Sequence, residues 1–296
     1  MTLIHMPITM AQMDEGGFSP LFRPQFKAKL PEEVCETSGL FFHNGRLWTH
    51  NDSGGEPILY ALDTTTFDIV QRITLENATN KDWEDVCTDG VNVYIGDFGN
   101  NRGDRKDLCV YKLPLSSLPD DGDATLSAEC INFRYSDQID FTSRKINDFD
   151  CEAFFVTDDY LYLLSKSWET GITRLYRLSK EPGDHVAELV NSFDSQGLIT
   201  GADYDRENHI LFTVGYMRTL WWPFIYIIYD FDEAGENLPN HRLEMPQLAW
   251  TQFEGICFFN YGQCYITSET NKGMVSSVFE VDLSKWIDKE LKNKKK

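Results

Sequence analysis

Asp82-Trp83-Glu84-Asp85-Val86, followed by Gly96-Asp97-Phe98-Gly99-Asn100-Asn101, is the best-preserved copy of a pattern that recurs along this 296-residue chain. The aligned segments are residues 36–40, 82–86, 150–154, 198–202 and 252–256. A short turn follows each copy, as in Thr88-Asp89-Gly90 and Asn260-Tyr261-Gly262. Asp-Gly and related turns favour β-hairpins because they tolerate positive φ. The pattern therefore predicts that each copy is a strand leading into a hairpin.

Three further strands are expected after each innermost strand. The second strands are predicted at 46–50, 92–95, 160–164, 209–213 and 263–267. Each third strand has an aromatic residue, then a spacer, then an aliphatic or aromatic residue. This signature occurs at 60–62, 111–113, 176–178, 229–231 and 279–281. More polar fourth strands are predicted at 68–75, 129–135, 185–193 and 240–245. Four antiparallel strands repeated every ~40–50 residues are typical of a β-propeller.

The last copy has no fourth strand of its own, and residues 24–30 have no partner in the first copy. Pairing these two ends would remove an open sheet edge. We therefore predict an all-β, five-bladed propeller over residues 24–284, closed by the N-terminal strand. Residues 1–23 would be an extension and 285–296 a basic, solvated tail. Long connections at 116–124 and 138–148 leave six blades as an alternative.

The bulk composition excludes several classes of partner. The net charge of −20 disfavours nucleic acid and anionic lipid surfaces. No apolar run approaches the ~20 residues of a membrane span. The N-terminus has no signal-peptide pattern, so a cytoplasmic protein is expected, or an exported one if a leader has been trimmed. Seven cysteines without a CxxC pair fit buried side chains in a reducing compartment. We expect a monomer.

Acidic side chains gather where the pattern predicts the mouth of the central channel. Innermost strands begin, and second strands end, at the same end of each blade. Pairs spaced i, i+2, such as Asp82 and Glu84, leave a strand on one face. The expected ring comprises Glu36, Asp82, Glu84, Asp150, Glu152 and Glu254, with Asp52, Asp97 and Glu269 behind it. The second members of the five pairs are residues 38, 84, 152, 200 and 254. Thirteen residues after each of them, the second strands should end at Asn51, Asp97, Ser165, Thr213 and Thr267.

Crowded carboxylates raise each other's pKa or bind a cation. Oxygen-only ligands suit Ca²⁺, or Mg²⁺, rather than zinc. Two alternatives remain: the mouth is polar because water fills it, or it binds an organic cation. If the ring holds a divalent cation, a small molecule or peptide is expected to bind above it. No P-loop, GxGxxG, HExxH, EF-hand or GxSxG motif occurs.

Several other side chains have two interpretations. Glu84, Asp82, Asp150 and His50 are candidate bases for a hydrolase, although a lone histidine at a strand end is commonly structural. Arg102 and Lys166 would hold an anion or neutralise the acids beside them. The tryptophans at 48, 83, 221, 222 and 250 fit packing between blades. The stretch 220–225 would alternatively form an exposed apolar loop.

The motifs Ser38-Gly39-Leu40, Trp48-Thr49-His50-Asn51-Asp52 and Glu254-Gly255-Ile256, together with the Asp82 and Asp97 segments, resemble propellers of the SdiA-regulated family. Related motifs occur in phytase-like esterase and strictosidine-synthase-like propellers. The resemblance spans most of residues 34–284. It implies a bacterial propeller, often exported, with a cation at the channel. This chain departs from the pattern at Leu198 and Thr200, where other copies carry acids.

Three functions are compatible with the sequence. The first is a propeller that binds a divalent cation and a ligand at the acidic mouth. The second is a metal-dependent hydrolase of phosphoesters, lactones or sugar derivatives, with the cation activating water. The third is a scaffold for protein partners. Fold alone does not decide among them.

Overall fold

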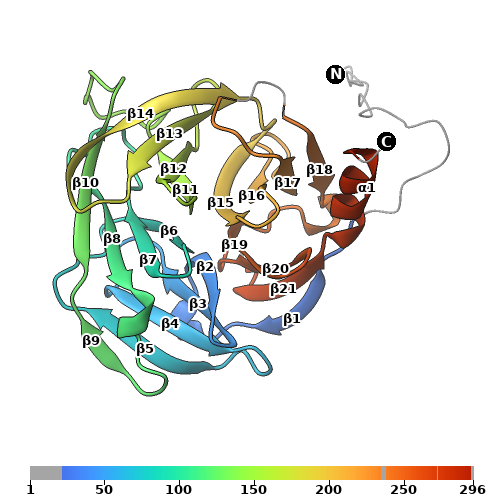
Figure 1. Cartoon of the computed structure of the whole chain (residues 1–296), viewed down its shortest axis with the longest axis horizontal. Helices are drawn as coiled ribbons and strands as arrows, with labels where there is room; N and C mark the ends of the chain where they lie inside the picture. The colour runs from blue at the N-terminus through green and yellow to red at the C-terminus, as the bar shows by residue number, and fades with distance from the viewer. Residues whose placement is uncertain (1–21, 235–237, 272, 295–296) are drawn as a thin grey trace, which may run out of the picture.

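The chain forms a ring of antiparallel sheets around a central axis (Figure 1). The structure is a computed structural model that describes residues 22–234, 238–271 and 273–294. It is almost entirely β, with 52% of residues in strands and 7% in helices. The prediction of an all-β propeller is confirmed.

Within the described residues, strand pairing forms five successive four-stranded units, called here blades one to five. Blade one contains β2 (Thr37–His43), β3 (Arg46–Asn51), β4 (Ile58–Asp63) and β5 (Ile69–Leu75). Blade two contains β6 (Trp83–Thr88), β7 (Asn92–Asp97), β8 (Leu108–Pro114) and β10 (Glu129–Tyr135). Blade three contains β11 (Cys151–Val156), β12 (Tyr160–Ser165), β13 (Thr173–Ser179) and β14 (Gly183–Phe193).

Blades four and five complete the ring. Blade four contains β15 (Leu198–Asp205), β16 (Ile210–Tyr216), β17 (Pro223–Tyr229) and β18 (Asn240–Glu244). Blade five contains β19 (Phe253–Asn260), β20 (Gln263–Ser268), β21 (Ser277–Asp282) and the N-terminal β1 (Gln25–Lys29). Strand β1 pairs antiparallel with β21, so the predicted closure by the N-terminal strand is confirmed. The innermost strands β2, β6, β11, β15 and β19 are neighbours around the axis (Figure 1).

The long connection between β8 and β10, within blade two, adds a strand to a neighbouring sheet, and β10 itself joins two blades. Strand β9 (Ala124–Leu126) pairs parallel with β5 on the outer edge of blade one. Strand β10 pairs parallel with β14, which joins the outer edges of blades two and three. The inserted residues therefore cover edges that would otherwise expose unpaired backbone groups.

Two expectations about the second half of the chain are wrong. Residues 223–229 form the third strand β17, whereas 229–231 were expected there. Of the stretch 220–225, considered as an exposed apolar loop, residues 220–222 lie in a loop with Leu220 exposed, and 223–225 belong to β17. The C-terminal segment was expected to be a solvated tail, but residues Ser284–Lys294 form helix α1. Ile287 on α1 is buried, and Trp286 packs edge-on against Phe22. The apolar side chains of this segment therefore join the core of blades four and five.

Every innermost strand carries a β-bulge at the same place. In blade two, Trp83 pairs with Asp97 and Asp85 with Gly96, so Glu84 has no partner residue in the ladder. Glu152, Thr200 and Glu254 are skipped in the same way in blades three, four and five, and Ser38-Gly39 in blade one. A bulge locally breaks the ladder and redirects the side chain. Simple i, i+2 alternation therefore does not describe the acid pairs.

Candidate functional site

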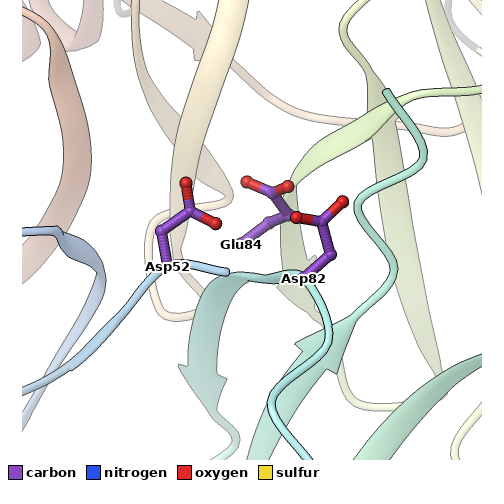
Figure 2. Close-up of side chains that lie close together, drawn as sticks. All are labelled: Asp52, Asp82 and Glu84. Atoms are coloured by element: carbon purple, nitrogen blue, oxygen red, sulfur yellow. The ribbon is translucent and has the colours of Figure 1, made fainter. Parts of the chain in front are cut away.

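Three carboxylates converge at one end of the channel. Asp52 follows the end of β3, Asp82 precedes β6, and Glu84 is the bulged residue of β6 (Figure 2). One oxygen from each lies within 4.8 Å of the others. Glu84 is buried, whereas Asp52 and Asp82 are partly exposed. The arrangement offers an incoming cation three oxygen donors and an opening to solvent.

The loop after β7 holds this group in place. A β-carbon on Gly99 would lie 2.0 Å from Glu84 Oε1 and 2.4 Å from Asp82 Oδ2. Only glycine lets the backbone approach both carboxylates so closely. The Asn101 Nδ2 donates a long hydrogen bond of 3.5 Å to Asp82 Oδ2. On the other side, Asn80 Nδ2 donates to the carbonyls of Asn51 and Asp52 and so positions the Asp52 loop.

Burial and mutual repulsion raise the pKa values of the cluster. Burial, followed by the charges of Glu152 and Asp82, raises the pKa of Asp52 to about 8. The pKa of Glu84 is raised well above its usual range, first by burial and then by Glu152 and Asp52. Burial also raises the pKa of Asp82. A divalent cation would favour the charged forms and offset this repulsion.

Blade three contributes a buried ion pair between an acid and a lysine. Lys166 Nζ lies 2.8 Å from Glu152 Oε2, and both side chains are more than nine-tenths buried. Burial alone would lower the pKa of Lys166, but the charge of Glu152 raises it above the usual range. Of its two predicted roles, Lys166 therefore neutralises the adjacent acid.

Asp150 has one carboxylate oxygen that is satisfied and one that is not. Its Oδ1 accepts the backbone N–H of Asn100 at 2.8 Å. Its Oδ2 is buried and has no hydrogen-bond partner. Burial and the charge of Glu152 raise the pKa of Asp150. A buried carboxylate oxygen without a donor is costly, so a proton or a cation would stabilise it.

Blade five supplies the remaining acids of the mouth. Glu254 is the buried bulged residue of β19, and Glu269 directly follows β20. The pKa of Glu254 is raised by burial, against the lowering effect of Lys166. The pKa of Glu269 is raised to about 7, mainly by burial and by Glu152. These couplings place both groups in the same electrostatic cluster as Asp52 and Glu152.

Three of the candidate residues have other environments. Asp97 forms a 2.9 Å ion pair with Arg105 and accepts the backbone N–H of Asp82. Glu36 is exposed, and its carbonyl accepts the N–H of Asp52. His50 is buried edge-on against Trp83, and burial lowers its pKa to about 4. His50 is therefore neutral at pH 7 and does not belong to the three-carboxylate group.

Blade four shows where counting along the sequence fails. Its second strand β16 ends at Tyr216, three residues later than expected, and Gly215, not Thr213, corresponds to Asp97. The next residue, Tyr216, therefore occupies the position of Asp52, Lys166 and Glu269 in other blades. The longer β15–β16 hairpin hides this equivalence. In blade five the count is wrong by one residue, because Ser268, not Thr267, occupies the position of Asp97. The sequence also has no signal for Arg105, because its pairing with Asp97 depends on the path of the loop after β7.

A surface groove of about 490 Å³ opens beside the cluster. Its lining includes Asp82, Ser53, Asn101, Arg102 and Arg105. Asp82 therefore faces both the three-carboxylate group and the groove. In the part of the chain that the structure describes, no helix has the length and apolar composition of a membrane span.

Comparison with known proteins supports the fold. No protein family and no curated protein matches the chain. An exo-β-1,3-galactanase from Phanerochaete chrysosporium, in complex with β-1,3-galactotriose, is similar in structure at 10% identity with a TM-score of 0.52. The match covers 86% of this chain and 63% of the galactanase. The aldose sugar dehydrogenase of Escherichia coli is similar at 8% identity with a TM-score of 0.49, covering 86% and 99% of the two chains.

The WD40 domain of Toxoplasma gondii coronin is similar at 12% identity with a TM-score of 0.41, covering 87% of this chain and 73% of that chain. Of these three matches, only that to the galactanase has a TM-score above 0.5. At such low identity they are informative about the fold alone. The resemblance to SdiA-regulated and phytase-like propellers stays a prediction.

Proposed function

We propose that this propeller binds a divalent cation, Ca²⁺ in the first place, between Asp52, Asp82 and Glu84. The convergence of three carboxylate oxygens within 4.8 Å carries the proposal. Carboxylate and amide oxygens are hard ligands that suit Ca²⁺ or Mg²⁺, and the group contains no thiolate or imidazole. The partly exposed Asp52 and Asp82 leave an approach for the ion and for a ligand above it.

A second observation supports a cation over a mouth that merely contains water. Asp150 Oδ2 is buried without a partner, and the charge of Asp150 contributes to the raised pKa of Glu84. Lys166 is paired with Glu152, and within the described residues no ion pair involves Asp52, Asp82 or Glu84. A bound cation would compensate this uneven distribution of charge.

Thermal unfolding with and without CaCl₂, after treatment with a chelator, tests the proposal. At about 100-fold excess over Kd, binding stabilises a protein by ~2.7 kcal/mol. For a chain of this size, that is a rise in Tm of roughly 4 °C. The rise should disappear in Glu84→Gln and Asp52→Asn. It should persist in Asp121→Asn, where the side chain is 87% exposed. No rise in the wild type, with either Ca²⁺ or Mg²⁺, rejects the cation site.

A glycine pair provides a subtler test that keeps every carboxylate. Gly99→Ala places a β-carbon against Glu84 and Asp82 and should weaken Ca²⁺ binding at least tenfold. Gly55→Ala is the matched control, because its added β-carbon meets nothing closer than 3.8 Å. Equal Ca²⁺ affinities of the two variants, measured by isothermal titration calorimetry, would contradict the position of the site.

Hydrolysis is the second candidate function, and one feature favours it. Asp82 lines both the cation group and the 490 Å³ groove, so a substrate in the groove would reach the ion. Carboxylates with raised pKa values, such as Asp82, serve as general bases near neutral pH. Phosphoester, ester and lactone substrates should be screened with Ca²⁺, Mg²⁺ and Mn²⁺. Activity that is lost in Asp82→Asn would support hydrolysis, whereas uniformly negative results would leave a binding protein.

A further inference from the structure

A column of aromatic rings extends outward from the acidic mouth. The Tyr216 and Trp221 rings stack with centroids 4.8 Å apart and an interplanar angle of 10°. Trp221 stacks in turn on Trp250 at 6.0 Å and 16°. Tyr216 is 2% exposed, whereas Trp250 is 49% exposed. The column therefore leads from the buried mouth to the surface.

Lys166 connects this column to the carboxylates. Its Nζ lies 5.4 Å from the centroid of Tyr216 and 5.7 Å from that of Trp168. The same atom is 2.8 Å from Glu152. The charges of Glu254 and Glu152 in turn influence the pKa of Tyr216. Acidic cluster and aromatic column are therefore parts of one continuous site.

The two outer rings come from different loops that are bonded to each other. The backbone N–H of Trp250, before β19, donates to the carbonyl of Trp221, between β16 and β17, at 2.9 Å. Both tryptophans have positive φ, 51° and 72°. Bulky residues rarely adopt this conformation. The backbone thus holds both indoles in position before any ligand arrives.

We propose that the mouth and the aromatic column together bind a neutral oligosaccharide. The proposal rests on the proposed cation site and specifies its ligand. Sugar hydroxyls would complete the shell of the cation, which takes six to eight oxygens in the case of Ca²⁺. The C–H face of a sugar ring would lie against the Trp250 indole. Because the Trp221 ring lies between Tyr216 and Trp250 in the stack, a ligand that extends from the cation to Trp250 must contain more than one sugar unit.

Charge favours this class over the alternatives. Acids dominate the mouth, so it would repel a polyanionic ligand. An organic cation would suit acids and aromatic rings. The ammonium group of Lys166, however, already lies between Glu152 and the Tyr216 and Trp168 rings. A second positive charge there would meet like charge. A neutral molecule with hydroxyl groups and an apolar face avoids both conflicts.

A printed array of neutral and acidic oligosaccharides, probed with the full-length protein in CaCl₂, tests the proposal. We expect neutral oligosaccharides to bind, with the strongest then measured by calorimetry. Trp250→Ala and Trp221→Ala should weaken that affinity at least tenfold while leaving Ca²⁺ affinity unchanged. Tyr160→Ala is the control, since Tyr160 is 37% exposed at the end of β12 away from the mouth. Sugar binding should also change tryptophan fluorescence in the wild type.

The outcomes separate the two proposals. If no array sugar binds to protein that binds Ca²⁺, the oligosaccharide proposal is overturned and the cation site stands. Sugar binding that is insensitive to chelator but lost in Trp250→Ala supports the aromatic subsite and overturns the role of the cation. Sugar binding that survives in both tryptophan variants overturns the subsite. Tight binding of choline or another ammonium compound, in place of sugars, would assign the site to organic cations.

Discussion

The Oδ2 atom of Asp85, on blade two, accepts the backbone N–H of Ala202, on blade four, at 3.2 Å. The same oxygen accepts the N–H of Phe154, on blade three, at 3.0 Å. One carboxylate thus connects three innermost strands across the axis of the ring. The residues that follow the bulge in blades three to five are Ala153, Gly201 and Gly255, and in blade one Gly39 is the second residue of the bulge. A β-carbon on Gly39 would lie 2.5 Å from Asp85 Oδ1, so the glycine at this position leaves room for Asp85.

We expect Asp85→Ala to be strongly destabilising. It leaves the buried N–H groups of Phe154 and Ala202 without an acceptor, at about 1–3 kcal/mol each. The free energy of unfolding in urea should fall by roughly 3 kcal/mol or more. Asp121→Ala, at an exposed position, should change it by less than about 0.5 kcal/mol. Similar unfolding midpoints for the two variants would show that the central hydrogen bonds are dispensable.

The raised pKa of Asp52 predicts that this carboxyl group makes the metal-free protein less stable as the pH rises. Since its folded-state pKa is about 8 and its unfolded value ~3.9, the folded state binds the proton more tightly. Its contribution to stability is complete below about pH 4 and is lost as pH rises through 8. Ca²⁺ requires the ionised carboxylate, so its affinity should rise over the same interval.

Thermal unfolding at pH 5, 6.5 and 8, in chelator and in CaCl₂, measures both effects. Comparison with Asp52→Asn separates the contribution of this group from that of the other titrating groups. In chelator, any advantage in Tm of the wild type over the variant should shrink or reverse toward pH 8. A difference that is constant with pH would mean that Asp52 titrates normally.

Two lysine ion pairs with similar N–O distances should differ in their contribution to the free energy of unfolding. Lys166→Met leaves Glu152 buried and unpaired, and the loss should be about 3–5 kcal/mol. Lys27 and Glu280 are 2.9 Å apart but 28% and 26% exposed, so Lys27→Met should cost no more than about 1 kcal/mol. Denaturation in chelator compares them. In addition, Ca²⁺ should partly restore Lys166→Met and leave Lys27→Met unaffected. Equal losses would contradict the interpretation of Lys166 as the counter-charge of the mouth.

Much of the site could be predicted because hairpin periodicity places strand ends. Asp82, Glu84 and Asp52 are brought together as expected, since β6 begins where β3 and β7 end. The environments of Asp97 and His50 could not be predicted. Arg105 reaches Asp97 through a loop without regular structure, and His50 turns toward Trp83 in the core.

The sequence by itself determined the repeat, the propeller and the strand that closes it, because alternation, turn residues and the missing last strand are local signals. Only the tertiary structure decided how the repeats differ. The bulges that redirect Glu84 and Glu152 lie where each innermost strand pairs with the second strand of its blade. Asp85 acts between blades, and the Tyr216 column forms from separate loops. Such contacts join residues far apart in the chain, and no local pattern encodes them.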